Sequence, residues 1–475
     1  TTGAGNVGIG RDALKANTTA ANNVAVGANA LVANTVGHSN VAIGTNALDA
    51  NVDGSHNVAV GYGVFTALDP ASAVEMWNTA VGSQSGTAVT TGINNTFMGG
   101  LSGDAVTTGN HNAAFGMQSL SATTTGSYNS AVGKYALLNN TSADNNTAVG
   151  YQALAANTTG AANTAFGTNA GLALTTGGLN VAYGYAALKT EDTGRRSTAI
   201  GYEALFTQNA DVDNYNTALG FQAGYAVTTG TTNTLVGGHA GGAITTGTNN
   251  VAVGASAGDA MVGAQENTVL GVHAGGAVTE GDSNVFIGYN SGVHAQATTT
   301  GGTNTIVGAY AHTTADDSAA ANGFGYNIAA IAGYTTVGAA DADIRAPHGN
   351  VTWSTISDER VKKDITDSTA GLSFINDLRP RTFKYKNKGD LPKEFSGYEE
   401  GSTEVYKNSN IHHGFIAQEV KAAIDSHSEI TDGFKMWNVR ETGAQEVGEA
   451  AVIPILVKAL QELSAKNDAL EARLT

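Results

Sequence analysis

A five-residue block of the form Asn-x-small-aliphatic-Gly recurs 18 times between residues 6 and 308. Fourteen of the 17 intervals between block starts are 17 residues long, and the others are 19, 20 and 21 residues, so one period dominates. A fixed period of this kind is typical of solenoids, in which each repeat buries its core against its neighbours. The blocks begin at Asn6, Asn23, Asn40, Asn57, Asn78, Asn95, Asn112, Asn129, Asn146, Asn163, Asn180, Ser197, Asn216, Asn233, Asn250, Asn267, Asn284 and Asn304.

Each block is predicted to form a short strand. Residues 23–27 read Asn-Val-Ala-Val-Gly, so the β-branched residues and Ala lie on opposite strand faces. A period of 17 fits a coil of two short strands and two turns, and the Gly in every copy excludes a heptad coiled coil. At about 4.8 Å per coil, 18 coils form a shaft roughly 85 Å long. The predicted fold is mainly β, with a parallel β-solenoid over residues 1–310.

The first and last residues of the block have physical explanations. Because the leading Asn recurs in register, we expect neighbouring coils to stack these amides into a ladder that satisfies donors and acceptors in turn. We expect the closing Gly to adopt a turn conformation that is closed to residues with a Cβ.

The eighth residue after the Asn is either large and apolar or Gly. The large residues are Leu31, Leu48, Phe65, Leu120, Leu137, Leu154, Leu188 and Leu205, and the glycines are Gly86, Gly103, Gly171, Gly224, Gly241, Gly258 and Gly275. Each Gly is followed three positions later by an aliphatic residue or Met, whereas Leu is usually followed there by a polar residue. We therefore expect two coil types that fill the same core volume from different positions.

Two kinds of sequence meet near residue 350. Residues 1–350 contain 7 Lys and Arg against 20 Asp and Glu, whereas residues 351–475 contain 16 against 20. Of the 62 glycines, 54 lie in the first of these parts. We divide the chain into a shaft at 1–310, a connector at 311–356 and a C-terminal domain at 357–475.

Composition also excludes several classes of function. The chain has no Cys, which excludes a disulfide scaffold, a Cys-based zinc site and a thiol nucleophile. The net charge of −17 argues against sequence-independent nucleic-acid binding, which needs a basic surface. No apolar run approaches the roughly 18 residues of a membrane span, so we expect no membrane insertion. Because Thr1 begins inside a repeat, we expect a fragment or a processed product.

The repeat blocks resemble the head repeats of trimeric bacterial adhesins. That resemblance rests on the five-residue block across about 300 residues, as in Asn-Val-Ala-Val-Gly at 23–27. It implies a left-handed parallel β-roll and a homotrimer around a threefold axis. The 17-residue period is longer than the period of that family.

Three motifs follow the shaft in order. Residues 357–365 read Ser-Asp-Glu-Arg-Val-Lys-Lys-Asp-Ile, residues 378–385 read Leu-Arg-Pro-Arg-Thr-Phe-Lys-Tyr, and residues 414–420 read Gly-Phe-Ile-Ala-Gln-Glu-Val. Taken alone, the first motif could be a charged loop that opens a helix. Together the motifs resemble the intramolecular chaperone domain of phage tail fibres and tailspikes, of the endosialidase type, and the resemblance covers nearly all of 354–475.

The resemblance implies a self-cleaving dyad. Carried over to this chain, Ser357 is the nucleophile, Lys362 is the general base, and the bond between Ile356 and Ser357 is cut. A Lys can act as a base only if desolvation or nearby cations lower its pKa, and Arg360 and Lys363 are candidates for such cations. The activity is at most a single-turnover serine–lysine endopeptidase, without an external substrate. His412 and His413 fit no part of the dyad, and we expect them to have packing or surface roles.

A terminal helix is expected over 454–474, where Pro454 suits its first turn. Apolar residues alternate spacings of 4 and 3, with one Asn at a position that could set the register. They are Leu456, Leu460, Leu463, Asn467, Leu470 and Leu474. We interpret them as a coiled-coil seam, although a helix packed on a single domain could show the same spacing. The C-terminal domain is thus expected to be α+β and to end in a coiled-coil helix.

We expect a homotrimeric phage tail fibre located in the virion, without cofactor or metal. Its partners would be its own copies, other tail-fibre proteins and a host-surface receptor, either a glycan or an outer-membrane protein. The alternative is a bacterial trimeric surface adhesin, but such proteins need a C-terminal membrane barrel and this chain ends in a helix. A depolymerising enzyme would need inward-facing carboxylate pairs, whereas the acidic residues here are scattered.

Overall fold

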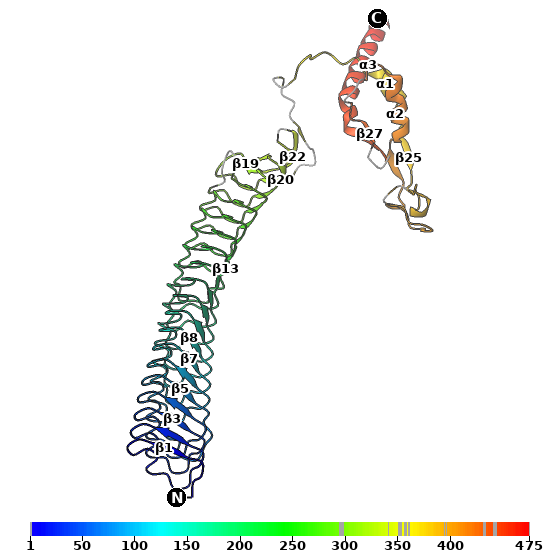
Figure 1. Cartoon of the computed structure of the whole chain (residues 1–475). Helices are drawn as coiled ribbons and strands as arrows, with labels where there is room; N and C mark the ends of the chain where they lie inside the picture. Colours follow the sequence, from blue (N-terminus) through cyan, green and yellow to red (C-terminus); the bar gives the residue numbers. More distant parts are fainter. Residues whose placement is uncertain are drawn as a thin grey trace. The chain divides into compact units, whose positions relative to one another are not determined.

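The structure is a computed structural model, and it describes residues 2–293, 299–340, 342–349, 354–355, 359, 362–393, 395, 397–430, 434–439 and 444–474. The chain divides into two compact units, Thr1–Ile356 and Ser357–Thr475. The first is a mainly β solenoid, as the repeat predicts, and it has about 19 coils where the repeat blocks predict 18 (Figure 1).

One three-residue strand from each coil builds a single long parallel sheet. The strands are β1 (Val7–Ile9), β2 (Val24–Val26), β3 (Val41–Ile43), β4 (Val58–Val60), β5 (Thr79–Val81), β6 (Thr96–Met98), β7 (Ala113–Phe115), β8 (Ser130–Val132), β9 (Thr147–Val149), β10 (Thr164–Phe166), β11 (Val181–Tyr183), β12 (Thr198–Ile200), β13 (Thr217–Leu219), β14 (Thr234–Val236), β15 (Val251–Val253), β16 (Thr268–Leu270), β17 (Val285–Ile287) and β18 (Thr305–Val307). Equivalent residues lie opposite each other, as Val24 and Val41 do. The longer intervals keep this register, with Thr198 opposite Thr217, so the turns absorb the extra residues.

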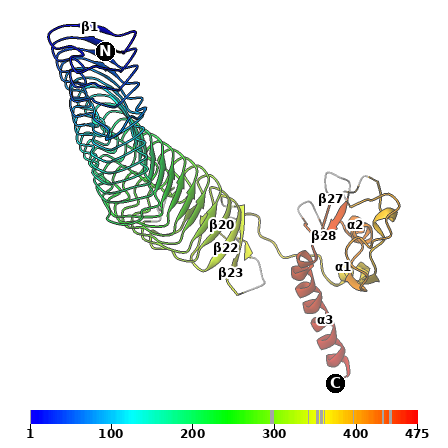
Figure 2. The same ribbon diagram turned by 90° about the horizontal axis from the view of Figure 1, so that it is seen from below.

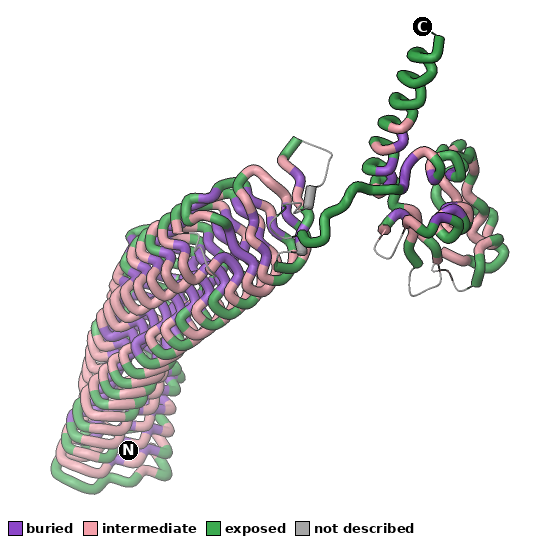
Figure 3. Tube along the Cα trace, turned by 90° about the horizontal axis from the view of Figure 1, so that it is seen from above, coloured by how far each residue is buried: buried purple, intermediate pink, exposed green. Residues whose placement is uncertain are grey.

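The predicted alternation along the strand is confirmed. Ala25 is fully buried in the coil, whereas Val24 and Val26 on either side of it are partly exposed. Figure 3 shows the buried residues following the inside of the coils for the length of the shaft. The core is therefore thin and is built largely from stacked Ala, with larger side chains supplied from the turns.

The expectation of two strands per coil is wrong for the described coils of β1 to β17, which have one strand each, whereas the last coils add a second strand after β18 and β20. After the block, the backbone turns twice through the left-handed region, at Asn29 (φ 60°) and Leu31 (φ 49°), and this breaks an extended conformation. Hydrogen bonds still connect these turns to the next coil, as from the Leu31 N–H to the Ala47 carbonyl at 3.1 Å.

The leading Asn and the closing Gly of the five-residue block behave as the sequence predicts. Gly27 has φ 138°, and a Cβ on it would lie 2.5 Å from the carbonyl oxygen of Gly44 in the next coil. The buried Asn23 side chain accepts a hydrogen bond from the Asn40 backbone N–H at 2.9 Å and donates one to the Gly37 carbonyl at 2.9 Å. The ladder therefore runs mainly between amide side chains and backbone, while direct amide–amide bonds join only some coils.

The two coil types fill one core, as expected. The large residues at the eighth position and the compensating residues that follow a Gly are all fully buried, among them Leu154 and Leu174. A Cβ on Gly171 would lie 2.9 Å from the Leu154 side chain and 3.0 Å from that of Leu174. Each Gly thus leaves room for side chains that enter from two other positions.

One pair of coils departs from the repeat. Ser197 replaces the ladder Asn, and the Gln208 side chain takes its place by donating to the Ser197 hydroxyl at 2.7 Å and accepting from the Asn216 amide at 2.8 Å. The fully buried Glu191 carboxylate accepts hydrogen bonds from Gln208, from Asn214 and from two backbone N–H groups of the following turn. These donors solvate a carboxylate that would be costly to bury unpaired.

The sheet continues beyond residue 310 and then changes direction. β19 (His312–Thr313) pairs with β21 (Ala329–Ala330), and β20 (Asn322–Tyr326) stacks in parallel on β18. β22 (Tyr334–Ala339) is parallel to β20, β23 (Ala342–Pro347) returns antiparallel to β22, and β24 (Ser354–Thr355) is antiparallel to β23.

The second unit is a small domain of short helices and hairpins around one core. Its elements are α1 (Leu372–Asp377), β25 (Arg381–Phe383), η2 (Lys388–Asp390), β26 (His412–Gly414), α2 (Ala417–Ser426), β27 (Trp437–Val439), β28 (Gln445–Val447), η3 (Glu449–Val452) and α3 (Ile453–Leu474). Phe374 of α1, Val420 of α2, Met436 and Ile455 of α3 form the centre of this core. The terminal helix lies where the sequence predicts it (Figure 2).

Candidate functional site

Of the expected dyad, the structure describes Lys362, whereas Ser357 and Ile356 lie outside the described residues. Lys362 is exposed and lies outside any helix or strand. Its backbone N–H donates a hydrogen bond to the Glu359 carbonyl at 3.0 Å. The pairing of Ser357 with Lys362 therefore stays a prediction.

The segment that carries Lys362 is anchored at its downstream end. Residues 362–369, which include the expected cation Lys363, are exposed, and the next residue, Ala370, is buried. The other expected cation, Arg360, lies outside the described residues.

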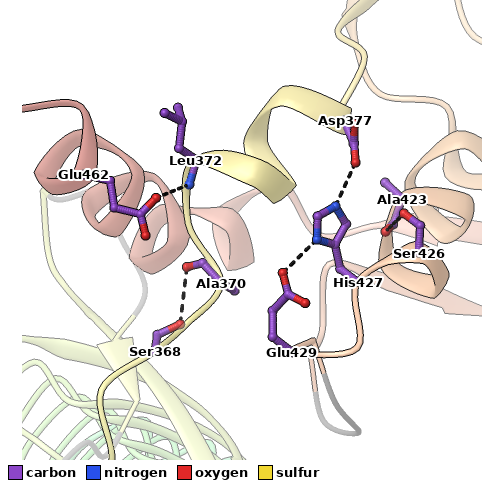
Figure 4. A network of polar contacts seen from close by, with 9 residues as sticks. All are labelled: Ser368, Ala370, Leu372, Asp377, Ala423, Ser426, His427, Glu429 and Glu462. Atoms are coloured by element: carbon purple, nitrogen blue, oxygen red, sulfur yellow. Dashed lines mark hydrogen bonds and ion pairs between the residues drawn. The ribbon is translucent and has the colours of Figure 1, made fainter. Parts of the chain in front are cut away.

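A residue of the terminal helix caps α1. The Glu462 carboxylate of α3 accepts a hydrogen bond from the Leu372 backbone N–H at 2.9 Å (Figure 4). Gly371, at the cap position, supplies no side chain, and a Cβ on it would lie 2.5 Å from Glu462 Oε1. A carboxylate here satisfies an N–H that has no partner inside the helix. The contact joins positions 90 residues apart, so sequence spacing could not reveal it.

The structure brings the second and third motifs together. β25 pairs with β26, with Arg381 opposite Gly414. The Arg381 guanidinium binds the Glu419 carboxylate through two hydrogen bonds, of 2.9 and 2.6 Å. The hydrogen bonding from Arg381 holds the pKa of Glu419 below its usual value. The motif residues thus join a hairpin to α2.

The two adjacent histidines on β26 have different surroundings. The half-buried His412 ring stacks on Phe383 at 5.8 Å between centroids, and its Nε2 lies 2.8 Å from Asn408 Oδ1. His413 is exposed. These surroundings fit the packing and surface roles expected for them.

A histidine network that none of the sequence motifs indicates lies beside α1. His427, at the end of α2, is 8 % exposed, with its Nε2 2.8 Å from the Asp377 carboxylate and its Nδ1 2.7 Å from the Glu429 carboxylate (Figure 4). The hydrogen bond with Asp377, followed by the one with Glu429, raises the pKa of His427. The one signal in the sequence is a Glu two residues after the His, which is too common to single out.

The terminal helix has two apolar faces. Ile455 and Ala459 are buried against the unit. The predicted seam lies elsewhere on α3 and is exposed, with Leu460 64 %, Leu463 52 % and Leu470 60 % accessible. The helix packs on its own domain through residues other than the seam, so the single-domain explanation for the seam does not hold.

Among the described residues, no cluster of three or more His, Asp or Glu side chains could hold a metal ion. None of the helices in this part of the chain has the length and apolar character that crossing a membrane requires.

Comparison with known families finds a match in the C-terminal unit. Residues 357–428 match the family described as the chaperone of endosialidase, and the match contains all three motifs. No curated protein and no solved structure is significantly similar to the chain. A chaperone domain of this type behind a β-solenoid fits a protein of the tailspike or endosialidase type, which confirms the resemblance drawn from the C-terminal motifs.

Proposed function

We propose that this chain, with an endosialidase-type chaperone unit behind a β-solenoid shaft, is part of a homotrimeric phage tail fibre or tailspike. The observation that carries the proposal is the family match, which begins at residue 357, where the C-terminal unit also begins. The chaperone unit assembles three copies, and the shaft gives the fibre its reach.

The exposed seam on α3 supports self-association through the chaperone unit. Leu460, Leu463, Asn467 and Leu470 line one groove along the helix. Because apolar residues recur at spacings of 3 and 4, this face matches the same face of another α3. Asn467 stands where a polar residue can fix register and number of strands.

A stripe along the shaft supports self-association as well. The third residue of every block strand is apolar or aromatic and at least partly exposed, namely Ile9, Val26, Ile43, Val60, Val81, Met98, Phe115, Val132, Val149, Phe166, Tyr183, Ile200, Leu219, Val236, Val253, Leu270, Ile287 and Val307. A contiguous apolar surface of this kind marks an interaction site. Its partner must share both its length and its period, and other copies of the same shaft do so.

The proposed cleavage is a single intramolecular event. Ser357 Oγ adds to the carbonyl carbon of Ile356 while Lys362 accepts the hydroxyl proton and delivers it to the departing amide nitrogen of Ser357. Water then hydrolyses the resulting ester, which leaves a carboxylate on Ile356 and restores the hydroxyl.

The mature fibre would act in host attachment. Its partners would be a glycan or an outer-membrane protein of the host and other tail-fibre proteins, and it would be located in the virion. The second candidate, a bacterial trimeric surface adhesin, rests on the block resemblance alone.

The self-cleavage prediction is tested by mass spectrometry of the full chain. Because only the pair of Ser357 and Lys362 is proposed to react, wild type should yield pieces 1–356 and 357–475 as trimers. The Ser357→Ala variant should give full-length trimers, and Lys362→Ala should behave in the same way. Wild type that stays intact after trimer assembly would remove the peptidase and leave the chaperone role standing.

A further inference from the structure

A row of side-chain oxygens follows one turn of the shaft, at the second residue before the block Asn. In this row the backbone N–H of one coil donates to the side chain of the equivalent residue in the next coil. Ile93 donates to Asn110 Oδ1 at 2.8 Å, and Asn110 donates to the Ser127 hydroxyl at 3.0 Å. Ser127 in turn donates to Asp144 Oδ1 at 2.7 Å. The side chains of this row thus satisfy backbone donors that the turn leaves without a carbonyl partner.

The row breaks in the next two coils, where the equivalent residues are Ala161 and Gly178. Neither has a side-chain acceptor, and the equivalent residue of the following coil is Arg195, whose side chain can only donate. Within the described residues, the backbone N–H groups of Asp144, Ala161 and Gly178 have no hydrogen-bond partner. A Cβ on Gly178 would lie 3.4 Å from the Ala161 nitrogen, so the space that the missing side chain leaves adjoins that nitrogen.

The break coincides with a depression of about 280 Å³ on the surface of the shaft. Its lining comes from three successive coils and includes Arg195, the hydroxyl-bearing Thr159 and Thr176, and Leu179, which is 54 % exposed. Ligand sites have this character, because apolar surface provides contact area and a few polar groups fix the orientation of the ligand. The volume lies at the lower limit of ligand pockets, roughly 300 Å³, so the depression suits one small unit of a larger ligand.

Arg195 is an unpaired cation on an acidic shaft. Its side chain is exposed and has no ion pair, hydrogen bond or ring contact with the residues that the structure describes. The adjacent Arg196 is engaged, because its guanidinium binds the Asp213 carboxylate at 2.9 Å and lies over the Tyr215 ring. Residues 1–350 contain 7 Lys and Arg against 20 Asp and Glu, so an unpaired cation marks one place where this shaft can attract an anion.

Two acidic side chains of the same coils have partners of their own. The Asp144 carboxylate accepts from the Ser127 N–H, and the Asp192 carboxylate accepts from the Thr175 hydroxyl at 3.3 Å. Neither residue lines the depression. An anion that reaches Arg195 therefore meets hydrogen-bond donors in the depression.

We propose that this depression binds the carboxylate of a hexuronic acid unit in a host-surface polysaccharide. The inference rests on the proposed host attachment, for which it names the class of ligand. The Arg195 guanidinium binds the carboxylate through two parallel hydrogen bonds, because its planar fork matches the two oxygens. The unpaired N–H groups of Ala161 and Gly178 supply further donors in place of the acceptors that other coils contain.

The remaining groups favour an acidic sugar over a phosphate. Thr159 and Thr176 offer hydroxyls that both donate to and accept from the hydroxyls of a sugar, and Leu179 offers apolar surface to the C–H groups of its ring. One unpaired cation matches the single charge of a carboxylate. A phosphate monoester carries about −1.5 to −2 and would leave excess negative charge on an acidic shaft.

The experiment measures the binding of oligogalacturonate to the assembled full chain by isothermal titration calorimetry. The ligand control is the methyl-esterified oligosaccharide, which should bind about tenfold more weakly or worse because it lacks the charge that Arg195 recognises. Arg195→Gln should weaken the binding of the acid by a similar factor. Lys134→Gln removes the same charge from an exposed side chain outside the depression, and it should bind like wild type.

Ala161→Asn tests the depression without a change of charge. The fold accepts Asn at this position of the coil, since Asn110 stands there and accepts from the Ile93 N–H. The new amide should accept from the Asp144 N–H and fill the depression, so binding should fall about as far as in Arg195→Gln. Hydrogen exchange of the variant should show these coils as protected as in wild type.

Three results would overturn the inference. Wild type that binds the methyl ester as tightly as the acid does not recognise a carboxylate. Arg195→Gln or Ala161→Asn that binds like wild type would place the ligand elsewhere on the chain. Inorganic phosphate that displaces the oligosaccharide at a lower concentration than monomeric galacturonate does would make the depression a phosphate site.

The proposed host attachment is tested separately, by adsorption of the assembled chain to bacterial cells. A chain that adsorbs to cells but binds no oligogalacturonate would overturn the site and leave attachment standing. A chain that binds the oligosaccharide but adsorbs to no cells would remove attachment and leave the site standing.

Discussion

The ladder residue of the shaft must both accept and donate a hydrogen bond. Asn163 accepts from the Asn180 backbone N–H at 3.0 Å and donates to the Gly177 carbonyl at 2.9 Å. Where Ser197 stands at this position, the Gln208 side chain supplies an amide, which donates to the Ser197 hydroxyl at 2.7 Å and accepts from the Asn216 side chain at 2.8 Å. The block therefore selects Asn for its two hydrogen-bonding functions in a buried position.

Replacing Asn163 by Leu should loosen the shaft locally. The Asn180 N–H and the Gly177 carbonyl would lose their partners, at a cost of about 1–3 kcal/mol for each buried unsatisfied group. Because each coil contacts only its neighbours, we expect faster hydrogen exchange in the adjacent coils and an intact solenoid elsewhere. Thr168→Leu, at an exposed position of the same coil, is the control and should change little. Unchanged exchange at these coils in the Asn163 variant would contradict the ladder.

The His427 network should make the stability of the C-terminal unit depend on pH. Its pKa is raised in the folded state by Asp377 and Glu429, above the unfolded value of about 6.5. The stabilisation is therefore fully present below that value and is lost as pH rises through the folded-state pKa. The difference in melting temperature between wild type and His427→Gln should be larger at pH 5.5 than at pH 8.5.

The control for this prediction is His413→Gln, which replaces an exposed histidine in the same unit. It should leave the pH profile unchanged. A His427→Gln difference that is equal at both pH values would show that the network stabilises the unit only through uncharged contacts.

Whether the conformation and contacts of a residue can be predicted from the sequence depends on where its partners lie. Asn23 and Gly27 could be assigned because their partners are the equivalent atoms of the next coil, which the period itself locates. The left-handed conformation of Leu31 could not, because Leu disfavours positive φ and only its complete burial in the coil offsets that cost. The contacts of His427 and Glu462 could not be predicted, because their partners come from distant segments of the chain.

At the scale of elements, α3 packs on the core of its unit through one face and leaves the apolar seam on another face exposed. Ile455 packs inside, Glu462 caps α1, and the seam leucines remain exposed. The sequence predicted the helix and its seam from spacing alone. It could not show which face the domain itself uses, because both faces carry apolar residues.

Replacing a seam leucine should dissociate the chaperone unit without unfolding it. In Leu460→Lys, each copy loses the burial of one Leu side chain, about 1.5–3 kcal/mol, and three Lys charges would meet in the seam. We expect analytical ultracentrifugation to show a shift from trimer toward monomer, with unchanged circular dichroism because Leu460 is 64 % exposed in the single copy.

Ala465→Lys is the matched control, since it adds the same charge at an exposed position of α3 outside the seam. It should leave the trimer intact. A Leu460→Lys variant that remains trimeric would mean that the copies associate through another surface.

At the scale of the whole molecule, the regularity that stabilises the shaft creates a problem of register. The apolar stripe repeats at every coil. In the proposed trimer, sliding one copy along another by a single coil would therefore restore most contacts. Sequences with many arrangements of similar energy have rough landscapes and become trapped. The C-terminal unit has no such repeat, and three copies of it can meet in one register.

Removing the C-terminal unit before folding should therefore prevent the shaft from forming an ordered trimer. Removing it after folding should leave the shaft unchanged. A chain that ends at Ile356 should give aggregates or trimers with shifted copies, because nothing aligns the coils as they begin to associate. The same chain released by cleavage from an assembled trimer should remain an ordered shaft, since its sheet is closed by its own last strands. Electron microscopy of the truncated chain and of the cleaved shaft shows whether the coils are in register. Native mass spectrometry of the same two samples shows whether they are trimers or aggregates. Ordered trimers from the truncated gene, in the yield of the full chain, would show that the shaft finds its register without the chaperone unit.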